Sequence, residues 1–160
     1  MSVQSADVRR HMDQLLNEES SLLAELEQTL RQEADVVRGN DPVAIERIGA
    51  SRHHCVDTLT RLDAERSSTC RMLSFGSGAN AFDQLLRWCD SSRSLRERWL
   101  GNLQAARRCK DLNDRNGAVV TLKLTQVQQL LTALRGGASP VYGRLGKRFD
   151  SVTVRELAQA

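Results

Sequence analysis

Hydrophobic residues recur at alternating steps of three and four along most of this chain, with charged and amide side chains between them. In residues 5–38, Leu16, Leu23, Leu30 and Val37 repeat every seven residues. This period places apolar side chains along one side of an α-helix, where they pack against other helices. The pattern therefore predicts one long helix over 5–38.

A glycine–asparagine pair ends the first helix, and Asp41 followed by Pro42 favours a new start. Aspartate caps free N–H groups at a helix N-terminus, and proline is well suited to the first turn. A second helix is predicted over about 42–73, with Arg52 and Arg66 at two of its apolar-seam positions. We expect these arginines to lay their aliphatic stems on the seam and to keep their charge in water.

The second half of the chain predicts a short helix and then a long one. A glycine- and serine-rich break precedes a short helix over about 79–90, whose apolar face contains Phe82, Leu85 and Leu86. The last helix is predicted over about 93–135, and two glycines and then a proline follow it. Its seam consists of Trp99, Leu103, Ala106, Asn113, Val120, Leu124, Val127, Leu131 and Leu134.

Asn113 is the one polar residue in this seam. A buried asparagine weakens packing but fixes the register of the helices, and a partly solvated asparagine on a loosely packed helix is the alternative. No segment shows the alternation of a strand, so the elements predict an all-α fold. We expect an elongated antiparallel helical bundle of three long helices and one short helix over residues 1–135, and a flexible C-terminal tail over 136–160.

Composition and charge narrow the classes of function. No apolar run is long enough to span a membrane, and the N-terminus lacks the layout of a signal peptide, so we expect a cytoplasmic protein without membrane insertion. Residues 1–45 carry a net charge of −5 and the remaining residues +8. This asymmetry favours pairing of an acidic first helix with basic later helices. Nucleic-acid binding is the alternative, but we do not expect it because no aromatic–basic cluster is present.

Residues that could bind metals or catalyse reactions are few and scattered. The four cysteines are 15, 19 and 20 residues apart, a spacing that matches no zinc or redox motif, and helical cysteines usually behave as small buried apolar residues. The two histidines before Cys55 point about 100° apart on a helix and cannot close on one metal. Neither a serine–histidine–aspartate arrangement nor a Glu-x-x-His pair is present. We therefore expect no enzyme, no metal and no cofactor.

Two blocks in the last third of the chain are more specific than the heptads. One is an LN-x-x-NG block within the last helix, and the other is a leucine followed by a YG-x-x-G tail. These blocks, which follow two long amphipathic helices, resemble the FlgN family of flagellar synthesis proteins, the cytosolic export chaperones of the flagellar type III secretion system. The similarity covers most of the chain and is strongest from about 95 to 146. The matching residues are Leu112, Asn113, Asn116 and Gly117 in the first block and Leu134, Tyr142, Gly143 and Gly146 in the second.

The resemblance implies a non-enzymatic protein that binds hook-associated proteins of the hook–filament junction before their export. Such a chaperone covers the C-terminal amphipathic helices of these clients, prevents premature association and delivers them to the export gate at the membrane. A structural coiled-coil subunit of a homo-oligomeric assembly is the alternative function. A homodimer is compatible with either of these two functions.

Two groups of residues are candidates for these contacts. Tyr142 and Gly143, in the glycine-rich tail, are expected to dock on the cytoplasmic domain of the export gate, and an ordinary half-exposed tyrosine is the alternative. An apolar groove at the end of the last helix suits an amphipathic client helix, and simple packing against the first two helices is the alternative. The candidate client-binding residues are Val120, Leu124, Val127, Leu131 and Leu134.

Overall fold

The computed structural model describes residues 3–134, which form four α-helices joined by short links. Helix α1 spans Val3–Gly39, α2 spans Pro42–Met72, α3 spans Ala79–Cys89 and α4 spans Ser94–Leu134. Each helix begins and ends within a few residues of its predicted bounds, and every regular element in this part of the chain is a helix. The all-α fold, with three long helices and one short helix, is confirmed.

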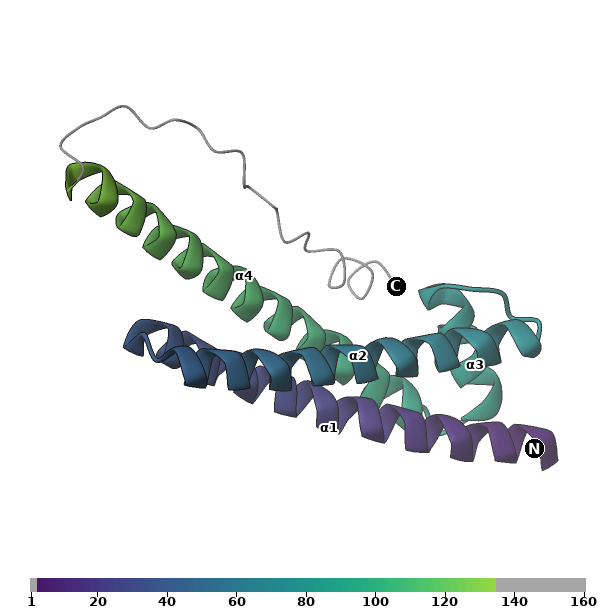
Figure 1. The fold of residues 1–160 in the computed structure, drawn as a ribbon. Helices are drawn as coiled ribbons and strands as arrows, with labels where there is room; N and C mark the ends of the chain where they lie inside the picture. Colours follow the sequence, from purple (N-terminus) through teal and green to yellow (C-terminus); the bar gives the residue numbers. More distant parts are fainter. Residues whose placement is uncertain (1–2, 135–160) are drawn as a thin grey trace.

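Helix α1 lies alongside both α2 and α4 over much of its length (Figure 1). Helix α2 returns antiparallel to α1, and α4 runs in the same direction as α1. Helix α3 and the links on either side of it lie at the end where α1 begins, which we call the closed end. The second half of α4 leads away from both α1 and α2 (Figure 1). The molecule is therefore an elongated bundle from which one long helix projects.

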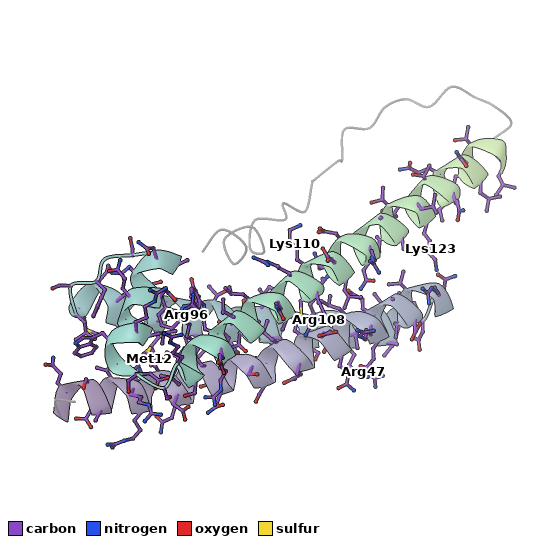
Figure 2. The ribbon with its side chains drawn as sticks, turned by 180° about the vertical axis from the view of Figure 1, so that it is seen from behind. Met12, Arg47, Arg96, Arg108, Lys110 and Lys123 are labelled. Carbon is purple, nitrogen blue, oxygen red and sulfur yellow. The ribbon has the colours of Figure 1, made fainter. Side chains whose placement is uncertain are left out.

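The core of the bundle consists of two apolar clusters. The first lies at the closed end, where the predicted face of α3 packs around Met12 and Trp99 (Figure 2). There the rings of Phe82 and Trp99 meet edge to face with their centres 5.2 Å apart. The second cluster lies further along the three long helices and contains Leu23, Leu26, Leu30, Cys55, Leu59 and Cys109.

All four cysteines are buried, as expected for small apolar residues in a helical core. Burial raises the pKa of Cys89 and of Cys109 to about 11. Burial also raises the pKa of the other two thiols. The cysteines are therefore neutral packing residues at physiological pH.

Two aspartates fix the starts of long helices. Asp41 caps α2 as predicted, and its carboxylate accepts hydrogen bonds from two N–H groups of the first turn at 3.1 and 3.2 Å. Asp90 is buried and accepts hydrogen bonds from the N–H groups of Ser92 and Leu95 at 3.1 and 2.9 Å. Burial by itself raises the pKa of Asp90, but hydrogen bonds from the Ser92 hydroxyl and from these N–H groups outweigh it and hold the pKa below its ordinary value. An ionised carboxylate thus orients the start of α4.

The opposite charges of the two parts of the chain meet across the bundle. Acidic side chains of α1 form ion pairs with arginines of α2 and α4, which confirms the pairing interpretation of the charge asymmetry. Most of these pairs are exposed, and an exposed pair contributes about 0–1 kcal/mol to stability. The five pairs are Asp13–Arg98, Glu18–Arg61, Glu19–Arg66, Glu27–Arg108 and Glu33–Arg52.

Candidate binding surface on the last helix

A buried polar layer joins α1, α2 and α4 near the closed end. Glu19, Arg66 and Asn102 form it, and they are 6%, 6% and 4% exposed. Arg66 lies 3.3 Å from one carboxylate oxygen of Glu19, and Asn102 donates a hydrogen bond to the other at 2.9 Å. Asn102 also donates to the backbone carbonyl of Leu16 at 3.0 Å. One residue from each long helix therefore meets inside the bundle.

The prediction that Arg66 keeps its charge in water is wrong. Its guanidinium forms ion pairs with Glu19 and Asp63 and lies 5.0 Å from the centre of the Phe82 ring. Removing a charge from water is costly, so a buried guanidinium needs partners of this kind. Arg52 fits the prediction better, because its side chain is 40% exposed.

A second polar layer repeats the first at a distance of fourteen residues on each helix. Glu33 lies 3.2 Å from Arg52, and Asn116 donates hydrogen bonds to Glu33 at 3.0 Å and to the carbonyl of Leu30 at 2.8 Å. Fourteen residues are about four helical turns, so the layers lie about 21 Å apart. The apolar residues of the second core cluster separate the two layers.

Asn113, the predicted seam residue, belongs only to the edge of this second layer. It is half-buried and accepts one hydrogen bond from Arg52 at 3.4 Å. The partly solvated alternative is therefore correct for Asn113. The buried asparagines are Asn102, which sequence reasoning did not select, and Asn116, which it placed in the LN-x-x-NG block but not in the seam.

A ladder of donors on α4 fixes its register against α1. From Asn102 to Lys123, every seventh residue of α4 donates to a backbone carbonyl of α1 that lies 86 positions earlier in the chain. A constant offset of this kind requires the two helices to run parallel and in register. The pairs are Asn102 with Leu16, Cys109 with Leu23, Asn116 with Leu30 and Lys123 with Val37.

Lys123 is the last member of the ladder. Its ammonium group reaches from α4 to the end of α1, where it also donates to the side chain of Asn40 at 2.7 Å (Figure 2). Beyond Lys123 the helix continues for eleven residues to Leu134. Lys123 is also the one charged residue between positions 117 and 134. The projecting half of α4 is therefore anchored at its base and carries no other charge.

The predicted client-binding residues lie on this projecting half and are all exposed. The alternative that they pack against the first two helices does not hold in this structure. We call these five residues, which keep the three-and-four spacing, the heptad stripe. Their exposed fractions are Val120 41%, Leu124 60%, Val127 53%, Leu131 45% and Leu134 75%.

Two further apolar residues on the projecting half are exposed, and sequence reasoning missed them. Leu122 is 59% exposed and Leu130 is 61% exposed. They fall outside the three-and-four spacing, which is why the seam did not include them. Large exposed apolar patches mark sites of interaction with other proteins or with membranes. A chain segment with seven such side chains is thus a candidate binding surface.

The LN-x-x-NG block lies at the point where α4 changes from a core helix into a projecting one. Leu112 packs against the second core cluster, and Asn116 ties α4 to α1. Gly117 is exposed with open space around it, so no neighbouring helix approaches it closely. A family model described as FlgN protein matches residues 10–148 of the chain. The chain belongs to the FlgN family.

Membership of the FlgN family makes the chain a protein of flagellum biogenesis and places it among chaperones rather than in a known enzyme family. No curated protein and no solved structure matches the chain. The FlgN match extends over the YG-x-x-G block, but Tyr142, Gly143 and Gly146 lie outside the described residues, as does the tail expected at 136–160. Within residues 3–134, no helix has the length and apolar character that crossing a bilayer requires.

Proposed function

We propose that this FlgN-family chain is a cytosolic flagellar export chaperone that binds the C-terminal helical segments of hook-associated proteins. The observation that carries the proposal is the exposed heptad stripe on the projecting half of α4. An amphipathic client helix buries its own apolar face against such a stripe. While it is bound, the client helix is shielded from premature association.

The charges of the projecting half support this choice of client contact. With Lys123 as its one charged residue, the surface offers apolar and amide side chains rather than ion pairs. Contacts of this kind are little affected by salt, since screening acts on charges. We expect a micromolar affinity, about −8 kcal/mol, because the chaperone must release its client at the export gate.

Calorimetric titration of the full chain with purified hook-associated proteins tests the proposal. The variant Val127→Asp/Leu131→Asp places charges in the heptad stripe and is expected to weaken binding at least tenfold. Thr125→Asp/Thr132→Asp places two charges on the opposite face of the helix, about 100–160° from the two altered stripe residues, and is the matched control, expected to bind within twofold of the parent. Circular dichroism checks that both variants remain helical. Unchanged binding by the stripe variant would remove α4 as the client site.

We propose that Tyr142 and Gly143 deliver the loaded chaperone by docking on the cytoplasmic domain of the export gate. The support is the resemblance of the tail to the family pattern and the extent of the family match. The variant Tyr142→Ala is expected to bind hook-associated proteins normally and to lose binding to the purified gate domain. Gate binding equal to that of the parent would assign docking to another part of the chain.

A further inference from the structure

The exposed apolar surface of the projecting half is too wide for a single partner helix. Successive residues of an α-helix are about 100° apart, so Leu122 and Leu124 point about 160° away from each other. Both are about equally exposed, at 59% and 60%. One helix packed against Leu124 leaves Leu122 in water.

The apolar residues fall into two stripes on the helix surface. The heptad stripe occupies a sector of about 80°, and a second sector of similar width lies with its centre about 115° away. We call the second sector the lateral stripe; it contains half-buried Val119, exposed Leu122 and Leu130, and the exposed amide of Gln126 between these two leucines. Lys123 lies between the stripes, and Thr121, Thr125 and Thr132 occupy the opposite face. The two stripes together span about 200°, whereas one helix–helix contact uses about 100°.

Both stripes continue lines of α4 residues that other helices cover nearer the closed end of the bundle. Asn113, which contacts α2 through Arg52, lies seven residues before the first member of the heptad stripe. Leu112, which packs on the second core cluster, lies seven residues before Val119 of the lateral stripe. In the bundle, α1 and α2 together cover these lines. Beyond Lys123 neither helix does so.

The α1–α2 turn lies beside the base of the projecting half. Lys123 joins the two through its hydrogen bond to Asn40. Close to this turn, Val43 and Ile45 at the start of α2 are 74% and 38% exposed. A pair of helices that continued the lines of α1 and α2 would therefore meet apolar side chains at its end as well as along its length.

We propose that the bound client supplies two helices, one for each stripe, which take the places beside α4 that α1 and α2 take in the bundle. This inference rests on the proposed function and specifies the form of the client. The near absence of charge on this end of α4 supports the same proposal, because the client surfaces that face it need apolar residues and no charged residues to pair with. A second copy of this chain is the competing occupant of the lateral stripe.

Three glutamate variants of the full chain separate these cases. Leu122→Glu/Leu130→Glu alters the lateral stripe, Val127→Glu/Leu131→Glu alters the heptad stripe, and Thr125→Glu/Thr132→Glu alters the opposite face. Each is titrated with an intact hook-associated protein and examined by sedimentation. If helicity falls in the lateral variant, the milder Leu122→Ala/Leu130→Ala replaces it.

Both stripe variants are expected to bind the client at least tenfold more weakly than the parent, and the opposite-face variant within twofold. Normal binding by the lateral variant, with binding lost in the heptad variant, would overturn the two-helix client and leave the proposed function intact. A parent dimer that the lateral variant converts to monomer would also overturn it, because a second copy then covers that stripe. If the parent binds no hook-associated protein, the proposed function itself fails.

Discussion

Arg66 offers the sharpest test of the buried polar layer. Replacing it with methionine keeps most of the side-chain volume but removes the guanidinium that lies 3.3 Å from Glu19. Both side chains are 8% exposed, so the variant would leave the Glu19 carboxyl group in the core with only Asn102 as a partner. Breaking a buried pair in this way costs about 3–5 kcal/mol. The free energy of unfolding of a typical domain is only about 5–15 kcal/mol, so this loss is a large part of it.

Arg61 provides a matched control on the same helix. Its side chain is 58% exposed and pairs with Glu18 at 2.9 Å, so Arg61→Met should cost no more than about 1 kcal/mol. Urea denaturation followed by circular dichroism measures both free energies of unfolding. The double variant Glu19→Leu/Arg66→Met removes both charges and should regain most of the loss. Equal costs for the two arginine variants would refute the reasoning that Arg66 is held in a buried layer.

Three further predictions concern other parts of the bundle. Asn116→Ala removes two hydrogen bonds to α1 and should lower the free energy of unfolding, measured by urea denaturation, by about 1–3 kcal/mol. Asn113→Ala should lower it by less than about 1 kcal/mol, and similar losses for the two variants would contradict the different burial of the two asparagines. Because the folded pKa of Asp90 lies below its ordinary value of 3.8, its stabilisation is complete above that value and declines as the pH falls through it towards the folded pKa. In urea titrations at a series of pH values, Asp90→Asn should therefore be less stable near neutrality and lose less stability on acidification, and parallel pH profiles for variant and parent would argue against this role. Burial raises the pKa values of Cys89 and Cys109 to about 11, so both thiols should resist iodoacetamide at neutral pH until urea unfolds the chain. Mass spectrometry measures the labelling, and rapid labelling of the folded protein would show that the thiols are accessible.

The helices could be predicted from sequence because their signals are local. Asp41 followed by Pro42 starts α2 through hydrogen bonds made within one turn, and the glycines near 76 prevent the helix from continuing. The repeat of Leu16, Leu23 and Leu30 indicates a helix with one apolar side, whatever apolar surface packs against that side. None of these features depends on which helix lies opposite.

The polar layers could not be predicted in the same way, because each needs three helices in register. The seam drawn from Trp99 in steps of seven selected Asn113, which lies on the line of α4 that faces α2. The neighbouring line, which contains Asn102 and Asn116, faces α1 instead. A signal was nevertheless present, since Glu19 and Glu33 are fourteen residues apart, as are the two asparagines.

The exposed apolar surface of α4, the candidate binding surface, could be located only in part from sequence. The heptad stripe was selected from its spacing, but the same spacing also suits a packed core, and only the divergence of α4 from α1 and α2 distinguishes the two. Leu122 and Leu130 break the spacing and were therefore invisible to a search for a single seam. A helix that exposes apolar residues on more than one side has no single period to detect.

The constant offset between α1 and α4 restricts how the length of this bundle can change. An insertion of one to six residues in either helix between the layers would rotate every later donor away from its carbonyl. Seven residues added to α1 and α4 alone would restore that match but would separate Glu33 from Arg52 on α2. Viable lengthening therefore has to come in whole heptads, added to all three helices together, and it would move the projecting end outward by about 10.5 Å for each heptad.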